Sequence, residues 1–344
     1  MESFLTPLLP LYVRERAAGR ALALAINLHT AGSTYSKPGA LLLIAGNGDY
    51  AGLLSGGCLE GDLRERAAAV IAGGEACRIG YDMRGPDDLL WGMGAGCEGA
   101  MDIFMMRTGP ANDWQPLHAL AEAQRTRQRA AVGIAVAPGS GAGLRAGQVL
   151  ALDAAEFGAD HADWLPERGA QTVFVLSPSL PPRLLLLGAG PDAQPVLQFA
   201  RQLGWPVTLY DHRPAYADPA RFPGAEQVVQ DRPERLHAAL DALRLSPDDY
   251  AAAVIMSHHL DSDAAYLRAL APTRVPYVGL LGPAPRRERL RAMLGDVAAR
   301  LDGRLRSPVG LDLGGRSAAA IALAMVAEIH AFLHGRHGGH FHGV

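Results

Sequence analysis

The chain has 344 residues, of which 49% are hydrophobic and 19% are charged, a composition typical of a globular protein and not of a disordered one. A chain of this length exceeds what a single hydrophobic core usually supports, so two domains are expected. The formal net charge of −3 leaves no broad basic surface, and no nucleic-acid partner is expected.

The cysteines and the first residues bear on the compartment. Cys58, Cys77 and Cys97 are too few for the disulfide framework of a secreted protein of this size. The first twenty residues lack a basic region ahead of their apolar run, and two prolines interrupt that run, so they do not resemble a signal peptide. No apolar run reaches membrane-spanning length without a charge, proline or glycine. We expect a cytoplasmic protein without a membrane partner.

The first elements in chain order are an amphipathic helix at residues 3–19 and an apolar strand, Ala21–Leu28. The turn that follows, His29–Gly39, combines serine and threonine hydroxyls with Lys37, and these groups could bind an anion. A plain polar turn explains the same composition, and the residues alone favour it.

The next stretch predicts a β-hairpin, a glycine corner and a helix. Strands Leu41–Ala45 and Tyr50–Leu54 flank Gly46-Asn47-Gly48-Asp49, which supplies the positive-φ residues that a tight hairpin turn requires. Ser55-Gly56-Gly57-Cys58-Leu59-Glu60 then leads into Leu63–Ile71, which has helical apolar spacing. The corner therefore places its thiol at or next to a helix N-terminus.

This placement has chemical consequences for Cys58. Exposed amides and the positive end of a helix dipole stabilise a thiolate, which is the nucleophilic and metal-binding form. Gly56 and Gly57 let a ligand approach the backbone closely, whereas Glu60 and Asp62 would oppose a second negative charge. A buried, unreactive cysteine is the competing interpretation, and the residues alone leave both open.

The remainder of the first half predicts further strands and one helix. Strand Ala76–Tyr81 carries Cys77 in a core-facing pattern, and a long glycine-rich loop ends at Cys97 before strand Ala100–Arg107. Like Cys58, Cys97 has glycine neighbours, but two cysteines without histidines at motif spacing are weak evidence for zinc. A helix is then expected at Asp113–Arg127, and strands at Ala130–Ala137, Gln148–Asp153 and Gln171–Leu176.

A domain boundary is expected at the sequence SPSLPP, which has the composition of a linker. We place an N-terminal domain at residues 1–177, a linker at 178–182 and a C-terminal domain at 183–344. In the second domain strands and helices alternate. The apolar run Arg183–Leu187 is typical of a strand buried on both faces, and further strands are expected at Val207–Tyr210, Gln227–Val229, Ala252–Met256 and Val275–Leu281. The predicted fold class is α/β, with an N-terminal mixed α+β domain followed by a Rossmann-like, doubly wound parallel sheet.

The first turn of the second domain, Gly188-Ala189-Gly190-Pro191-Asp192-Ala193, fits the G-x-G-x-x-A pattern of dinucleotide binding. Asp211 ends the second strand, where a ribose-binding acid is expected. However, Pro191 has no N–H to offer a pyrophosphate, and Pro195 makes Asp192 the expected N-cap. A capping carboxylate would repel phosphate at this place. A nucleotide-type fold is therefore expected, and tight NAD(P) binding less so.

Polar residues follow the fourth strand of this domain in the motif Ser257–Asp263 (SHHLDSD). At the carboxyl edge of the sheet, His258, His259 and Asp261 could ligate a metal or hydrogen-bond a pterin or a phosphate. Capping of the next helix by Asp261 or Ser262 is the alternative.

Two arginines follow the fifth strand. Arg286 and Arg287 could bind phosphates there, although a solvated helix start explains them nearly as well. Arginine is almost the only cation of the chain, since Lys37 is its single lysine, and a GC-rich genome produces the same bias.

The last expected element is a helix over Ala318–Phe332, capped by Ser317. Ile321, Met325 and Ile329 repeat at four-residue spacing along it, which predicts a core-facing stripe and not a site. The histidine-rich tail after this helix could bind a metal adventitiously, but a frayed end is expected.

Three motifs occur in a specific order along the chain: the turn GST-x-x-x-PGA, the corner SGGCLEG, and the later series SHHLDSD…VGLLGPAPRR…SPVGLDLGGRSAAAIALAMVAEI. Together they resemble the xanthine dehydrogenase accessory family (XdhC/CoxI type), over Ala31–Thr108 and Arg183–Ala331. The chain departs from the family at Cys97-Glu98-Gly99, where a cysteine followed by two glycines is usual.

The resemblance implies a carrier that binds molybdenum cofactor (molybdopterin or its dinucleotide form) between its domains, protects it during sulfuration and delivers it to a molybdenum hydroxylase. The implied partners are the large subunit of that hydroxylase and a cysteine desulfurase, and the implied assembly is a homodimer. The implied cofactor-binding residues are Ser33, Lys37, Ser55, Gly56, Gly57, Cys58, Glu60, Cys97, Gly188, Gly190, Asp211, His258, His259, Asp261, Arg286 and Arg316. Cys58 is also the implied metal ligand.

Three functional hypotheses follow. The first is a cofactor-insertion chaperone without catalytic residues, because no Ser/His/Asp set, paired carboxylates or Walker loop can be assembled from the motifs. The second is an NAD(P)-dependent oxidoreductase that uses Gly188, Gly190 and Asp211. The third is a redox-sensing or metal-storage module that uses Cys58 and Cys97.

Overall fold

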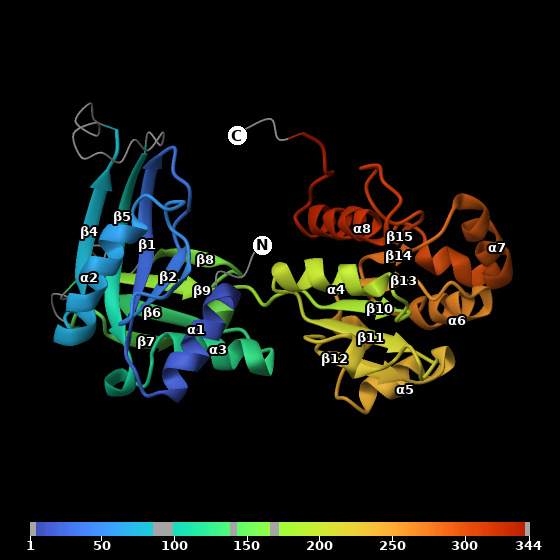
Figure 1. Cartoon of the computed structure of the whole chain (residues 1–344), viewed down its shortest axis with the longest axis horizontal. Helices are drawn as coiled ribbons and strands as arrows, with labels where there is room; N and C mark the ends of the chain where they lie inside the picture. Colours follow the sequence, from blue (N-terminus) through green and yellow to red (C-terminus); the bar gives the residue numbers. More distant parts are fainter. Residues whose placement is uncertain (1–4, 85–98, 138–142, 166–171, 341–344) are drawn as a thin grey trace. The chain divides into compact units, whose positions relative to one another are not determined.

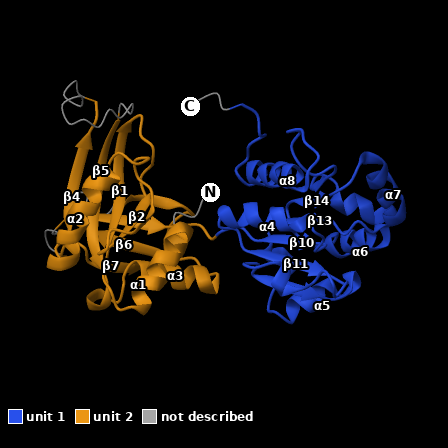
Figure 2. Cartoon of the chain, viewed as in Figure 1, with its two compact units in different colours: residues 1, 181–344 blue, residues 2–180 orange. Residues whose placement is uncertain are grey.

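The computed structural model describes residues 5–84, 99–137, 143–165 and 172–340 of the chain. Contacts divide the chain into two units, residues 2–180 and residues 181–344 (Figure 2). Cys97, one of the predicted site residues, lies outside the described ranges.

The N-terminal unit contains two antiparallel sheets, with strand orders β3-β2-β1-β5-β4 and β7-β6-β9-β8 (Figure 1). The first sheet consists of β1 (Leu22–Gly32), β2 (Leu41–Ala45), β3 (Tyr50–Gly52), β4 (Cys77–Asp82) and β5 (Gly99–Thr108). The second consists of β6 (Ala131–Ala135), β7 (Val149–Leu152), β8 (His161–Trp164) and β9 (Val173–Ser177). The helices are α1 (Leu9–Ala17), α2 (Glu60–Gly73) and α3 (Leu117–Thr126), with short 3₁₀ helices at Thr6–Leu8, Pro110–Asn112 and Ala154–Glu156.

Strand β1 buries both of its faces, each in a different core. Leu22, Leu24 and Ile26 pack with residues of α1, α3 and the second sheet, whereas Ala23 and Ala25 pack with residues of α2 and β4. Alternate residues of a strand face opposite sides, so the leucine–alanine alternation sets a large-residue face and a small-residue face. The small face lets α2 lie close to the sheet, and α2 carries the glycine corner at its start.

Several expected elements have different bounds in the structure. β1 continues beyond Leu28 to Gly32 because β5 pairs with it along that whole length. α3 begins at Leu117 and not at Asp113, because Asp113 and Trp114 have φ values of 50° and 51°, which a right-handed helix does not accommodate. Strand β8 has no counterpart among the expected strands.

The C-terminal unit contains a six-stranded parallel sheet of order β12-β11-β10-β13-β14-β15. This confirms the predicted Rossmann-like fold. Its strands are β10 (Leu184–Leu187), β11 (Val207–Asp211), β12 (Gln227–Gln230), β13 (Ala252–Ile255), β14 (Val278–Leu280) and β15 (Leu305–Arg306). Its helices are α4 (Ala193–Gln202), α5 (Leu236–Asp241), α6 (Leu260–Leu270), α7 (Ala284–Leu294) and α8 (Ala318–Leu333), with 3₁₀ helices at Pro219–Arg221, Pro233–Arg235, Pro247–Asp249 and Gly295–Leu301.

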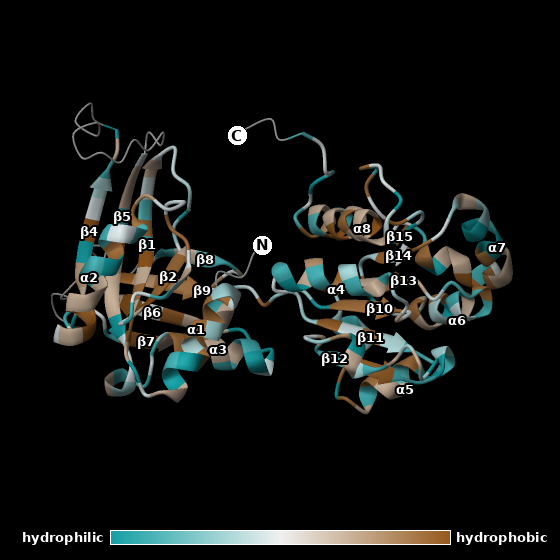
Figure 3. Cartoon of the chain, viewed as in Figure 1, coloured by the Kyte–Doolittle hydropathy of each residue, from teal (hydrophilic) through white to brown (hydrophobic). Residues whose placement is uncertain are grey.

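Helices cover both faces of this sheet. α4 and α8 pack on one face, and α5, α6 and α7 pack on the other. β10 lies in the middle of the sheet and is fully hydrophobic (Figure 3), as expected for a strand buried on both faces. The strand order reverses between β10 and β13, and ligands of such sheets bind at the carboxyl ends of the strands at this switch point. None of the helices in the described ranges is long and apolar enough to span a membrane.

Candidate functional site

The glycine corner of the N-terminal unit is built around the carboxylate of Glu60. Oε1 accepts hydrogen bonds from the backbone N–H groups of Leu54 (3.0 Å) and Ser55 (2.9 Å). Oε2 accepts from the Gly57 N–H (2.9 Å) and from the Ser55 hydroxyl, and the Ser55 oxygen in turn accepts from the Leu59 N–H (2.7 Å). Glu60 and Ser55 are both buried. Both predicted site residues therefore hold the loop in shape from inside.

The loop presents its thiol outward. Gly56 and Gly57 have φ values of 74° and 116°, a backbone conformation that residues with a Cβ rarely adopt. Cys58 is exposed, so the alternative of a buried cysteine is wrong. Leu59 occupies the N-cap position of α2, which places Cys58 immediately before the helix, as predicted.

The turn after β1 lies against this loop. A Cβ added to Gly56 would lie 3.2 Å from Cδ2 of Tyr35, so the segment Ser33–Lys37 and the corner are neighbours. Ser33 and Lys37 are exposed, whereas Ser36 is buried and accepts a hydrogen bond from Nδ2 of Asn27 (3.0 Å). The structure thus places two predicted groups, the polar turn Ser33–Lys37 and the glycine corner that carries Cys58, next to each other in one unit.

The pKa of Glu60 reflects its role in the loop. Burial by itself would raise the pKa, but the hydrogen bonds from Ser55 and from the backbone outweigh it, and the pKa is lowered below the ordinary value. Because the folded-state pKa is depressed, the stabilisation by the carboxylate is fully present above the pKa of an unfolded glutamate, about 4.3. It is lost as the pH falls through the folded-state value.

We expect Glu60→Gln to lower the free energy of unfolding by about 2 kcal/mol at neutral pH. The amide nitrogen of glutamine is a donor and has to face a donor of the loop. Urea titration measures the loss, and faster hydrogen exchange of the peptide that covers Leu54–Leu59 locates it. Glu65→Gln, which changes an exposed residue of the same helix, is the matched control with an expected change below about 0.5 kcal/mol. Equal effects of the two variants would contradict this role of Glu60.

A second group of predicted residues lies at the carboxyl edge of the parallel sheet. In the turn after β10, Gly188 donates its N–H to the Tyr210 carbonyl (2.8 Å) and Ala193 donates to the Gly190 carbonyl (3.0 Å). Ala189 donates to Oδ2 of Asp211 (2.8 Å). These amides serve the fold itself and are not directed to a phosphate.

The predicted ribose-binding acid, Asp211, is buried and fully engaged. Besides the Ala189 N–H, it accepts the backbone N–H of Arg213 (2.9 Å) and two bonds from the Arg213 guanidinium (3.0 and 2.7 Å). Burial opposes ionisation, but the bonds from Arg213 and Ala189 prevail and lower the pKa of Asp211. This carboxylate ties the glycine turn to β11.

Asp192 is at the predicted N-cap position of α4, but its side chain makes no capping hydrogen bond. Instead, Nε2 of His258 donates to Oδ2 of Asp192 at 2.7 Å. His258 has a φ of 59°, which turns it across the switch point from the end of β13 toward the turn after β10. The expected capping role of the Asp192 carboxylate is therefore wrong, because the carboxylate is held by a residue distant in sequence.

Other residues of the motif after β13 have separate structural roles. His259 is the N-cap of α6, and its Nδ1 accepts the Ser262 N–H (3.4 Å), so the alternative of a cap by Asp261 or Ser262 is wrong. Asp261 is exposed. Arg316 is also exposed, in the loop before α8, and Ser317 caps α8 as predicted.

One buried network was not anticipated from the sequence. Asp263 is 1% exposed, and its Oδ2 accepts two bonds from the Arg286 guanidinium (3.0 and 2.6 Å). Its Oδ1 accepts the hydroxyl of the buried Ser257. Arg286 was predicted to contact phosphate, but this ion pair neutralises much of its charge. The sequence offered one signal for this network, the aspartate four residues after the histidine pair His258-His259.

A cavity of about 290 Å³ adjoins this edge, and among its lining residues are Asp192, His258, Gly282, Arg286, Ile321 and Met325. Ile321 and Met325 were expected to face only the core. Met325 is buried in the core, yet both also line the cavity, because α8 passes the carboxyl end of β14. Two predicted site residues of the C-terminal unit, His258 and Arg286, therefore line one cavity.

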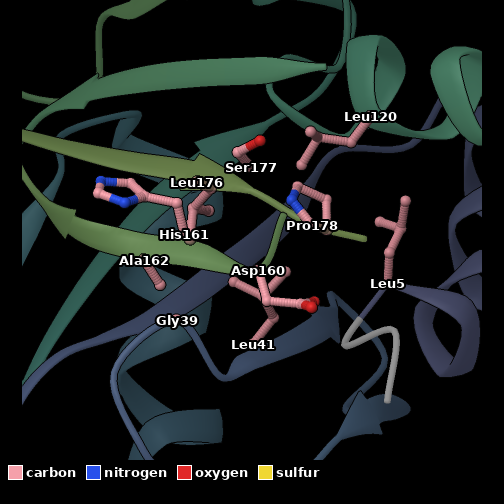
Figure 4. A pocket seen from close by; sticks show the side chains of 10 residues that line it. All are labelled: Leu5, Gly39, Leu41, Leu120, Asp160, His161, Ala162, Leu176, Ser177 and Pro178. Atoms are coloured by element: carbon pink, nitrogen blue, oxygen red, sulfur yellow. The ribbon is translucent and has the colours of Figure 1, made fainter. Parts of the chain in front are cut away.

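A smaller cavity lies in the N-terminal unit (Figure 4). It measures about 20 Å³ and its walls are mostly apolar, with Leu5, Leu41 and Leu120 among them. This is room for about one water molecule. None of the predicted site residues lines it.

Comparisons with known proteins agree on one family. The model described as "XdhC and CoxI family" matches residues 15–82, and the model described as "XdhC Rossmann domain" matches residues 184–329. The chain is 32% identical over 328 residues to a probable xanthine dehydrogenase subunit of Bacillus subtilis, covering 89% of this chain and 91% of that one. It is 29% identical over 163 residues to the uncharacterized protein YqeB of Escherichia coli, which covers 47% of this chain and 29% of that one. The structure is similar to a crystal structure of a xanthine dehydrogenase from Bacillus halodurans, with a TM-score of 0.78, 28% identity and 97% coverage of both chains.

Proposed function

The chain belongs to the XdhC and CoxI family of xanthine dehydrogenase accessory proteins, and on this premise we propose that it carries molybdenum cofactor as cargo. In this proposal the chain is not itself an enzyme. It protects the cofactor while a cysteine desulfurase supplies the sulfur, and it delivers the cofactor to the large subunit of a xanthine dehydrogenase-type molybdenum hydroxylase. A homodimer is part of the same proposal.

The observation that carries the proposal is the exposed Cys58 on a corner whose shape is fixed from inside by Glu60. Thiolates are soft ligands, and soft sulfur ligation suits a metal that is already bound by sulfur. Two glycines before the thiol leave the backbone open to a large ligand. Within the described ranges no three His, Cys, Asp or Glu side chains gather as a metal site. Cys58 would accordingly add one ligand to a metal that arrives with its own.

The first test is the content of molybdenum and pterin in protein purified from a host that makes the cofactor. Molybdenum is measured by mass spectrometry of the metal, and pterin by its fluorescence after oxidation. We expect both, in equal molar amounts. If neither is present and cofactor added to the purified protein does not bind, the proposed function is wrong.

We expect Cys58→Ala to reduce the bound molybdenum at least tenfold while the fold is retained, because the loop is held by Glu60 and not by the thiol. The measurement is the metal and pterin content beside the wild-type protein. Cys77→Ala is the matched control, since Cys77 is half-buried on β4 and burial raises the pKa of its thiol. Unchanged retention in Cys58→Ala would remove this residue from the site.

A further inference from the structure

The cavity of the C-terminal unit has walls of two kinds. Its polar lining includes the Asp192–His258 pair, which lies in the turns after β10 and β13. Its apolar lining includes Leu281, Ile321 and Met325. We propose that this cavity binds a flat heterocycle through a 2-amino-4-oxo edge, the edge that pterin and guanine share, with Asp192 as the acceptor of its N–H groups, and that it does not bind a pyrophosphate.

The turn after β10 is poorly suited to a phosphate. The N–H groups of Gly188, Ala189 and Ala193 are used inside the protein, and Pro191 and Pro195 have none. A pyrophosphate at this turn needs several free amides and a positive helix end. Here the helix end carries the carboxylate of Asp192, which repels an anion.

The nearby arginine does not reverse this balance. Two nitrogens of Arg286 bind the Asp263 carboxylate, so the pair is close to neutral as seen from the cavity. Once this pair is counted as neutral, the carboxylate of Asp192 leaves the lining without a net positive charge. Arginine is therefore placed to give a directed hydrogen bond and not to attract a phosphate by charge.

The size and lining of the cavity fit a single ring system. Its volume of about 290 Å³ is near the lower end for pockets that hold drug-sized molecules, about 300 Å³, so a ring system fits better than a whole dinucleotide. The apolar lining residues can pack against a ring face, and the Asp192 carboxylate provides a charged acceptor. Oδ1 of Asp192 is buried and makes no hydrogen bond within the described part of the chain. A carboxylate accepts two neighbouring N–H groups well, and the 2-amino group and N3–H of the proposed edge are two such donors.

Arg286 completes the complementarity. Its Nε and Nη2 atoms bind Asp263, which leaves Nη1 to donate to the 4-oxo oxygen of the ring. The ring chemistry is inferred from the cavity, whereas the choice of pterin as the natural ring rests on the proposed function. Guanine would come from the dinucleotide form of the same cargo or from a free nucleotide.

The test compares ligand binding by the full chain with ligand binding by its Asp192→Asn variant. Binding of 6-hydroxymethylpterin, guanosine, NADH and inorganic pyrophosphate is measured by equilibrium dialysis with each protein. We expect Asp192→Asn to weaken both rings at least tenfold, because asparagine presents a donor to one of the two N–H groups. Asp302→Asn, which changes an exposed acid that pairs with Arg291 outside the cavity, should leave binding unchanged.

Ring analogues identify the edge and its source. Lumazine and inosine lack the 2-amino group and should bind at least tenfold more weakly than pterin and guanosine, respectively. The tighter of pterin and guanosine identifies the natural ring. If Asp192→Asn instead tightens pyrophosphate or NADH and leaves the rings unaffected, the cavity is a phosphate site and the inference is wrong. Failure of both rings to bind the wild-type protein also overturns it.

These results separate the inference from the proposed function. If the protein carries molybdenum and pterin but Asp192→Asn does not change ring binding, the proposed function stands and the inference is wrong. If the protein carries no cofactor but binds guanosine through Asp192, the inferred ring chemistry stands and the proposed function is wrong.

Discussion

Asp263→Asn is expected to lower the free energy of unfolding of the C-terminal unit by about 3 kcal/mol, the lower end of the range for breaking a buried ion pair. Asp263 is 1% exposed and Arg286 is 22% exposed, so the arginine regains part of its hydration. The variant leaves the guanidinium and the Ser257 hydroxyl facing a neutral amide. Hydrogen exchange of amides in β10 and β13 measures this free energy separately from that of the other unit.

A control and a second variant make this expectation specific. Asp261→Asn changes an exposed acid in the same first turn of α6 and should cost less than about 0.5 kcal/mol. In Asp263→Asn combined with Arg286→Met, no charge is left without a partner, so the loss should be smaller than the sum of the two single losses. Additive losses would show that the two side chains do not act as a pair.

Gly188→Ala is expected to cost about 4 kcal/mol, the largest single effect that we foresee. Gly188 has a φ of 123°, and strain of this kind costs about 1–3 kcal/mol. In addition, the new Cβ would lie 2.5 Å from the carbonyl oxygen of Met256 and 2.7 Å from the backbone nitrogen of Ser257. Overpacking against a rigid backbone costs about 1–3 kcal/mol more. Thermal unfolding of the full chain, together with the same exchange measurement, tests the sum.

Gly190→Ala is the matched comparison two residues away. Its nearest obstacle is the Oδ1 atom of Asp192, at 2.6 Å, and a side-chain end can move where a backbone cannot. We expect a loss below about 1 kcal/mol. Equal losses of stability at the two positions would show that the cost comes from replacing any glycine of this turn. It would then not come from the close contact between Gly188 and the end of β13.

Much of the fold followed from local pattern. Leu184–Leu187 is apolar at every position and became the central strand β10, because only a strand with two covered faces tolerates such a run. The hairpin around Gly48 was predictable for a similar reason, since few residues other than glycine adopt its φ of 86°. The family was also readable from its motifs. These features depend on residues that are neighbours in the chain.

The function of individual site residues was decided only by the tertiary structure. The sequence placed Glu60, Asp192 and His258 near ligand-binding turns. It could not show that Glu60 turns inward to bind its own loop, or that Asp192 pairs with a histidine 66 residues away.

The same holds for the helix cap by His259 and for the Asp263–Arg286 pair. A side-chain hydrogen bond depends on which backbone elements meet in space and on the rotamer that the packing allows, and neither is recorded in spacing along the chain. The sequence therefore determined most of the elements, their order and the family. The contacts between distant elements decided which polar groups hold the fold and which remain available to a ligand.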